Sequence, residues 1–295
     1  MTLHHSGTTL PSFGERLEQT FTERGALCVG IDPHSWLLNE WGLPDTAAGA
    51  ESFGRTVIAA TAGQAGIVKP QVAFFEKFGS AGFVALERVL ADARAAGLIV
   101  IADVKRGDLG TSVEAYGQAW LGAGSPLEVD AITVNAYMGV GSLDSTFALA
   151  AAGGKGVFVL SATSNPEGPS IQQAVVSAGE FAGQSVAAAV LSGVAARNAA
   201  SDTGVLGSIG VVLGATMDIG SYGIDIARAP ATALTPVLAP GFGHQGGDVR
   251  ALNALYGGYA RGVIVSESRS ILSTGPANLA QTIAHRVAEA GAVRG

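Results

Sequence analysis

The chain has 295 residues, of which 48% are hydrophobic and 14% charged, with a formal net charge of −7 at pH 7. This composition excludes an intrinsically disordered chain, and the lack of any basic run excludes the usual electrostatic footprint of nucleic-acid binding. A single cysteine, Cys28, excludes an intramolecular disulfide framework and a multi-cysteine metal site.

Residues 1–12 are expected to form a loose leader, and residues 13–295 a single catalytic domain. The leader is polar and lacks the apolar stretch of a signal peptide. No apolar run reaches the length of a membrane span without glycine or a charge interrupting it. The sequence therefore predicts a cytoplasmic protein with no membrane partner.

Short apolar runs alternate with segments of helical spacing along the whole chain. Strands are predicted over residues 26–31, 66–69, 98–103, 131–134, 156–160, 208–213, 236–239 and 262–265. Helices are predicted over residues 13–24, 46–61, 79–96, 111–121, 143–152, 183–200 and 277–290, with a loop over 36–41. Thr111 and Glu114 have the spacing of a capping box at the start of the fourth helix.

Eight strands alternating with helices over this length predict one α/β domain, a (β/α)8 TIM barrel. An open doubly wound sheet is the alternative, but no G-x-G-x-x-G fingerprint follows the first strand. Polar residues follow nearly every strand. They are Asp32, Lys69, Asp103, Asn135, Thr163 and Arg269. In barrels of this kind, the carboxyl-terminal ends of the strands carry the catalytic residues.

The segment LIVIADVKRGDLGTS, residues 98–112, places Asp103, Lys105 and Asp108 within six residues. Side chains alternate along a strand, so Asp103 and Lys105 are expected on the same side. Three charges at the exit of a buried strand are costly to desolvate, which favours a functional site. The alternative is an ion pair at a strand end followed by a helix cap.

The loops after the seventh and eighth strands suit a phosphate group, which barrels often bind there. The segment PGFGHQGG, residues 240–247, allows backbone N–H groups to approach an anion, and Gln245 can donate from its amide. Arg269 can grip phosphate oxygens with its planar guanidinium group. The alternative is a flexible loop beside a surface arginine, and Glu267 would repel phosphate unless it faces away.

The pattern D-x-K-x-x-D in DVKRGD resembles the signature of the orotidine 5′-monophosphate decarboxylases. Four further segments strengthen the likeness to the bacterial type 2 branch of that family: GIDPH at 30–34, VKPQVAFFE at 68–76, ATSNPEG at 162–168 and PGFGHQGGD at 240–248. The resemblance implies decarboxylation of orotidine 5′-monophosphate (OMP) to UMP and CO2 in pyrimidine biosynthesis, without a metal ion or other cofactor.

The resemblance also implies a role for each matched charge. Lys105 would protonate C6 of the pyrimidine after CO2 leaves, and Asp103 would lie beside the substrate carboxylate. Lys69, Asp103, Lys105 and Asp108 would form an alternating array of charges. Asp108 would reach into the neighbouring subunit, which implies a homodimer with shared active sites.

Other matched residues would bind the substrate. They are Asp32, Ser164, Gln245, Arg269 and Ser112. The family implies a ribose contact for Asp32, a pyrimidine contact for Ser164 and phosphate contacts for Gln245 and Arg269, with the loop that carries Gln245 closing as a lid. No role is assigned to Asn135.

Three other functions fit parts of the pattern. A 3-keto-gulonate-6-phosphate decarboxylase shares D-x-K-x-x-D but uses Mg²⁺ to stabilise an enediolate. A Schiff-base aldolase would use Lys69 or Lys105 with a depressed pKa. A non-catalytic protein would bind UMP and release no CO2.

Overall fold

Eight parallel strands close into a barrel in the computed structural model, which describes residues 10–201 and 204–293. The strands follow one another around the barrel in chain order, and β8 pairs with β1. They are β1 Leu27–Ile31, β2 Ile67–Pro70, β3 Ile99–Arg106, β4 Ala131–Val134, β5 Gly156–Ala162, β6 Ile209–Leu213, β7 Val237–Pro240 and β8 Val263–Glu267. The predicted (β/α)8 fold is confirmed, and the open sheet is wrong.

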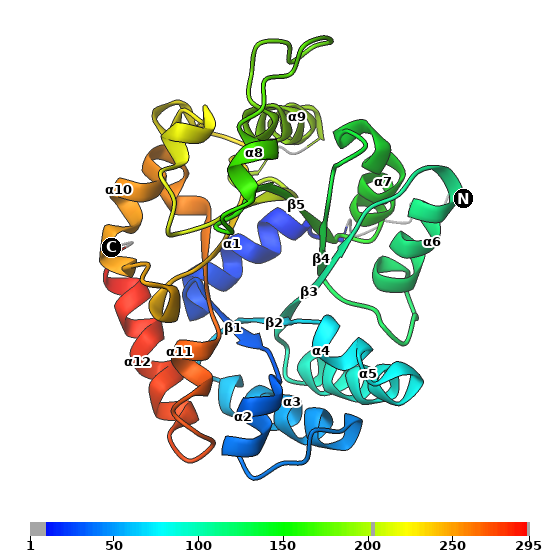
Figure 1. Ribbon diagram of the computed structural model, residues 1–295, viewed down its shortest axis with the longest axis vertical. Coiled ribbons are helices and arrows are strands. Elements are labelled where there is room, and N and C mark those ends of the chain that lie inside the picture. The colour runs from blue at the N-terminus through cyan, green and yellow to red at the C-terminus, as the bar shows by residue number, and fades with distance from the viewer. Residues whose placement is uncertain (1–9, 202–203, 294–295) are drawn as a thin grey trace, which may run out of the picture.

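Helices surround the barrel on all sides, as Figure 1 shows. The α-helices are α1 Phe13–Arg24, α2 Ser35–Glu40, α3 Ala47–Thr61, α4 Ala73–Glu76, α5 Gly79–Ala95, α6 Gly110–Leu121, α7 Asp144–Ala152, α8 Gly168–Gln172, α9 Val186–Ser201, α10 Leu252–Tyr256, α11 Arg269–Leu272 and α12 Leu279–Ala292. The 3₁₀ helices are η1 Val140–Leu143, η2 Ile219–Tyr222, η3 Ile226–Arg228, η4 Gly243–Gln245, η5 Val249–Ala251 and η6 Gly257–Gly262. Because helices cover the outside of the strands, β1, β4, β6 and β8 are buried at every residue.

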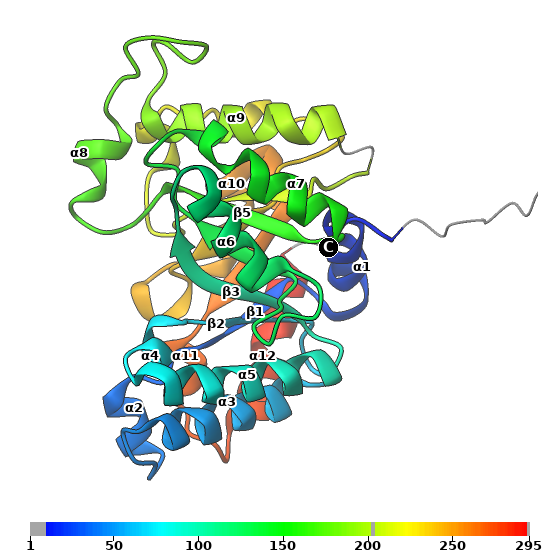
Figure 2. The ribbon, with the colours of Figure 1, turned by 90° about the vertical axis from the view of Figure 1, so that its right-hand side faces the viewer.

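Helix α1 closes the amino-terminal end of the barrel, whereas α2, α4 and α8 lie at the opposite end (Figure 2). The ring of Phe13 packs edge-on against Phe158, with the ring centroids 5.9 Å apart. Gly156 is required here, because a Cβ atom at this position would lie 2.4 Å from the Phe13 ring. The open mouth of the barrel is therefore at the carboxyl-terminal ends of the strands.

Three local predictions are wrong. Residues 36–41 are expected as a loop, but 36–40 lie in α2 and Trp41 follows its end. The inner face of α2 buries Leu37 and Leu38, which provides the apolar contact that a short helix needs. The capping box of Thr111 and Glu114 is absent, because α6 begins at Gly110 and Thr111 lies inside its first turn. The third strand does not end at residue 103, since pairing with β4 resumes at Arg106 after an irregularity.

The predicted leader lies mostly outside the described residues, and Ser12 at its end caps α1 in a complete capping box with Glu15. In the described part of the chain, no helix combines the length and the apolar character that crossing a membrane would require.

Candidate active site

The carboxylate of Asp103, in β3, is held between two ammonium groups. Lys69 Nζ in β2 lies 2.9 Å from Oδ2, and Lys105 Nζ lies 2.6 Å from Oδ1. The hydroxyl of Thr133 in β4 donates a third hydrogen bond to Oδ1 at 2.8 Å. Three adjacent strands thus converge on one carboxylate at the mouth of the barrel.

Burial and charge act in opposite directions on Lys69 and Asp103. Their side chains are each only 9% exposed. Burial acts to lower the pKa of Lys69, but the nearby carboxylates of Asp103 and Asp32 outweigh it and raise that pKa above its ordinary value. Burial acts to raise the pKa of Asp103, and the two lysines instead bring it well below the usual range. The pair is therefore ionised at neutral pH.

Lys105 combines an unusual backbone with an accessible side chain. Its φ is +46°, a left-handed conformation that costs a non-glycine residue about 1–3 kcal/mol. The backbone N–H of Lys105 donates to the Thr133 hydroxyl at 3.0 Å, which holds the irregular strand in place. Its side chain is 47% exposed, so the ammonium group touches Asp103 and also faces the open mouth.

A small cavity of about 90 Å³ adjoins this cluster and is lined by residues from both ends of the chain, among them Asp32, Lys69, Gln245, Ser268 and Arg269. The Ser268 hydroxyl donates to Oδ2 of Asp32 at 2.6 Å. The other oxygen of Asp32, Oδ1, is buried and has no hydrogen-bond partner among the described residues. Burying a carboxylate oxygen without a partner costs free energy. This oxygen is therefore a candidate to accept a hydrogen bond from a ligand hydroxyl.

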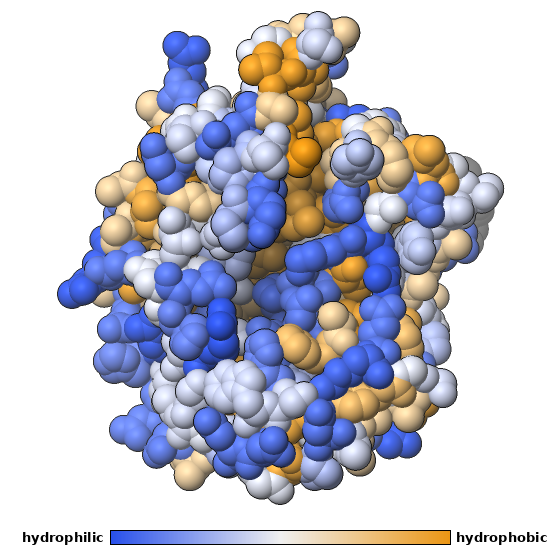
Figure 3. All heavy atoms as spheres, in the orientation of Figure 1, coloured by the Kyte–Doolittle hydropathy of each residue, from blue (hydrophilic) through white to orange (hydrophobic). Residues whose placement is uncertain are grey.

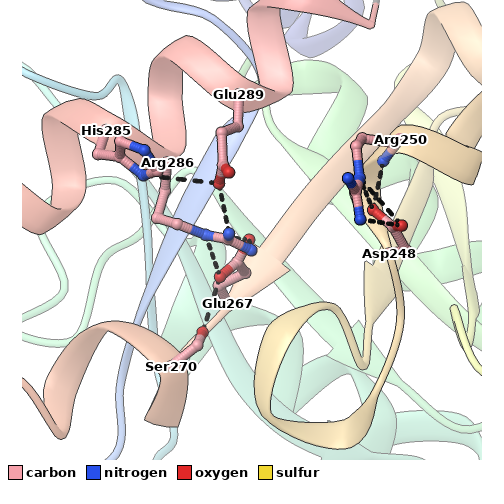
Figure 4. A network of polar contacts seen from close by, with 7 residues as sticks. All are labelled: Asp248, Arg250, Glu267, Ser270, His285, Arg286 and Glu289. Carbon is pink, nitrogen blue, oxygen red and sulfur yellow. Dashed lines mark hydrogen bonds and ion pairs between the residues drawn. The ribbon is translucent and has the colours of Figure 1, made fainter.

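The side chain of Glu267 faces away from this cavity. It is 1% exposed and pairs with Arg286 of α12 on the outside of the barrel, as Figure 4 shows. The repulsion of phosphate that the sequence allows for is thus reduced, because the charge of Glu267 is paired with Arg286.

The remaining predicted residues lie around the mouth without touching the lysine cluster. Asp108 accepts a hydrogen bond from the Leu109 N–H at 2.8 Å, and within the described parts of this chain it pairs with neither Lys69 nor Lys105. Ser112 is exposed in the first turn of α6, and Ser164 is exposed just beyond β5. Figure 3 shows this face of the molecule, with hydrophilic side chains around a central hollow.

Two contributors are not among the residues predicted from the sequence. Thr133 is the one polar residue in the buried run AITV of β4, and that exception is a signal that could have identified it. Ser268 stands next to the predicted Arg269, but its partner Asp32 is 236 residues away, and only the closure of the barrel joins them.

The described donor groups do not form a metal site. Among residues 10–201 and 204–293, no three His, Cys, Asp or Glu side chains come together as a metal site would require. Both oxygens of Asp103 already accept hydrogen bonds from cations or a hydroxyl.

Comparison with known proteins identifies one family. A profile described as the orotidine 5′-phosphate decarboxylase / HUMPS family matches residues 25–281. Orotidine 5′-phosphate decarboxylase from Streptomyces coelicolor is 47% identical over 265 residues, which cover 90% of this chain and 91% of the relative. The enzyme of that name from a Nocardioides species is 49% identical over 260 residues, covering 88% and 91% respectively.

Solved structures resemble the whole fold. A protein from Streptomyces avermitilis has a TM-score of 0.88 and 42% identity, with 99% of both chains covered. The OMP decarboxylase of Leishmania donovani has a TM-score of 0.75 and 30% identity, with 96% of this chain and 99% of that chain covered.

The hydroxyl of Thr133 should contribute measurably to stability. In Thr133→Val the shape is kept, but a buried charged acceptor and the Lys105 N–H each lose a partner, so the free energy of unfolding should fall by about 2 kcal/mol. Urea unfolding at pH 7 measures this. Thr133→Ser, which keeps the hydroxyl, is the matched control and should lose less than about 1 kcal/mol. A valine variant as stable as the wild type would contradict the assignment.

Proposed function

The chain belongs to the orotidine 5′-phosphate decarboxylase / HUMPS family and is a carboxy-lyase, and from this premise we propose that it converts OMP to UMP and CO2 by direct protonation from Lys105. The observation that carries the proposal is the carboxylate of Asp103 fixed between two ammonium groups, beside a cavity suited to a ribose phosphate.

The chemistry requires a cation and a proton at the same carbon. When the bond between C6 and the carboxylate breaks, CO2 leaves and the electron pair stays on C6, where no adjacent carbonyl takes it up by simple resonance. A fixed ammonium group lowers the energy of that developing charge, and the same group then transfers a proton to C6. Lys105 meets both requirements because it is anchored by Asp103 yet open to the mouth.

The neighbouring charges keep Lys105 in position. Lys69 binds the second oxygen of Asp103, which fixes the direction of the first oxygen toward Lys105. Asp103 would lie beside the substrate carboxylate, and relief of that like-charge contact as CO2 leaves is a secondary contribution.

The cavity residues would hold the rest of the substrate. The unpartnered Oδ1 of Asp32 would accept a hydrogen bond from a ribose hydroxyl, and the neighbouring Lys69 would donate one to the ribose. Gln245 and Arg269 would bind the 5′-phosphate, and closure of the exposed Gln245 loop over it would convert remote binding energy into rate. Ser164 would contact the pyrimidine, and Ser112 the substrate from α6.

A homodimer with shared sites is the second part of the proposal. Large apolar side chains are exposed beside Asp108, on the segments that follow β3 and β4. They are Leu109 at 55%, Tyr116 at 39%, Tyr137 at 84% and Met138 at 39% exposure. An exposed apolar patch of this kind favours an interface, and it would carry Asp108 to the Lys105 of the partner.

The aldolase is the weakest of the alternatives. A Schiff-base lysine needs a depressed pKa to act as a nucleophile. The pKa of Lys69 is raised, because the attraction of Asp103 and Asp32 exceeds the effect of burial.

Loss of the Lys105 ammonium group should abolish turnover but leave the nucleotide site intact. We expect Lys105→Ala to lower kcat for OMP by about 10³-fold or more, with the Kd for UMP changed less than about tenfold. A direct absorbance assay of OMP and calorimetric titration with UMP measure the two effects. Lys77→Ala, which removes a lysine outside the cavity, should turn over like the wild type. Near-normal turnover by Lys105→Ala would reject the role, and a wild type that binds UMP without releasing CO2 would establish the non-catalytic alternative.

The reaction should not depend on a divalent cation. We expect full activity on OMP after dialysis against excess EDTA, and no gain on adding Mg²⁺, since an ammonium group rather than a metal stabilises the developing charge. Activity that disappears with EDTA and returns with Mg²⁺ would instead favour the Mg²⁺-dependent decarboxylases of phosphosugars.

Mixing two inactive variants should restore activity if the sites are shared. A hybrid of Asp108→Asn and Lys105→Ala subunits has one site with both residues intact. Random exchange at equal concentrations should then give about one quarter of wild-type activity, since half of the dimers are hybrids with one working site each. Light scattering and tagged-subunit exchange confirm that hybrids form. Hybrids without activity would count against the cross-subunit role of Asp108.

A further inference from the structure

Glu267 is a buried carboxylate that the reaction proposed above does not use. It is the last residue of β8, two positions before Arg269. Arg286 binds both of its oxygens, with Nη2 2.6 Å from Oε1 and Nε 2.9 Å from Oε2. Figure 4 shows these two side chains reaching toward each other between α12 and the end of β8. A carboxylate this deeply buried is stable only because such a two-pronged partner compensates its desolvation.

Two loops contact the Glu267 carboxylate, namely the turn that carries Arg269 and the loop after β7. The Ser270 hydroxyl in the turn of Arg269 donates to Glu267 Oε2 at 2.7 Å. From the loop after β7, Gly243 packs on the same two residues. A Cβ atom on Gly243 would lie 2.7 Å from the Ser270 Cβ and 3.0 Å from Glu267 Oε2.

Three backbone hydrogen bonds close the loop after β7, and buried Phe242 within it packs near Tyr256 of α10. Gly243 N–H donates to the Gly247 carbonyl, Gly247 N–H to the Gly241 carbonyl, and Gly246 N–H to the Gly243 carbonyl. These bonds make the segment that presents Gln245 a small rigid unit. Because Gly243 belongs to this unit, its contact with Glu267 and Ser270 sets where Gln245 lies relative to Arg269.

We propose that Glu267 is a positioning residue for the phosphate end of the site: held by Arg286, it fixes the spacing between the Arg269 turn and the Gln245 loop in the closed position of that loop. The inference rests on the proposed function in one respect, that these two loops bind the 5′-phosphate. Glu267 does not touch the substrate, since it lies on the outer side of the barrel wall.

The decisive measurement compares a ligand with a phosphate to one without. We expect Glu267→Gln to weaken UMP binding about tenfold, because a neutral amide binds the guanidinium group less firmly and the loops shift. Uridine, which lacks the phosphate, should bind within about twofold of the wild type. With OMP, KM should rise by a similar factor as the UMP Kd, while the thermal midpoint reports any general loss of folding.

Glu289→Gln is the matched control. Glu289 also pairs with Arg286, but its side chain is 40% exposed and its other ion pair is with His285 of the same helix. It should leave the UMP-to-uridine affinity ratio unchanged. Gly243→Ala disturbs the same contact from the opposite side and should reproduce the selective loss of UMP affinity, which keeps the test valid if Glu267→Gln folds poorly.

The affinities of the variants for UMP and uridine decide whether Glu267 positions the phosphate loops. A selective loss of UMP affinity in Glu267→Gln or Gly243→Ala, with Glu289→Gln like the wild type, supports the proposal. Unchanged UMP affinity, equal losses for UMP and uridine, or the same loss in Glu289→Gln overturns it, as does a wild type that does not distinguish UMP from uridine. Failure of the proposed reaction is recognised separately, as wild-type protein that prefers UMP to uridine yet releases no CO2 from OMP.

Discussion

The carboxylate of Asp103 is the group on which the mouth of the barrel depends. It is 8% exposed, and a charge so deeply buried persists only with close partners. Lys69 and Lys105 each occupy one oxygen, and Thr133 adds a hydroxyl to the oxygen that Lys105 uses. The requirement to satisfy this carboxylate thus determines where the Lys105 ammonium group lies. The same contacts that make the buried charge tolerable hold the ammonium group proposed as the proton donor.

Closure of the barrel provides the second constraint. Because β8 pairs with β1, the turn after β8 lies beside the end of β1, and Ser268 reaches Asp32. Gly30 makes this approach possible, since a Cβ atom there would lie 2.7 Å from the Ser268 Cβ. Ser268 binds one oxygen of Asp32, and the other oxygen is buried without a partner among the described residues. Arg269 is the next residue, so one turn positions both Asp32, proposed for the ribose, and Arg269, proposed for the phosphate.

The sequence predicts the parts of this site that follow from strand periodicity and fails where partners come from afar. Asp103 and Lys105 are two apart in one buried strand, so their contact could be anticipated. That Thr133 joins them depends on the register of β4 against an irregular stretch of β3, which has no local signal. The outward direction of Glu267 is likewise decided by Arg286, a residue of the last helix that no local pattern connects to β8.

Residues at the end of β8 contact both the cavity at the mouth of the barrel and the outer helix α12. Ser266 lines the cavity, Glu267 points outward to α12, and Ser268 lines the cavity again, as alternation along a strand requires. An ion pair between the barrel and its outer helices therefore lies within two residues of Arg269. If only apolar contacts held α12 against the barrel, small shifts of this helix would cost little free energy. Here the bidentate pair of Glu267 and Arg286 resists them, because any shift weakens two charge-assisted hydrogen bonds in a dry environment.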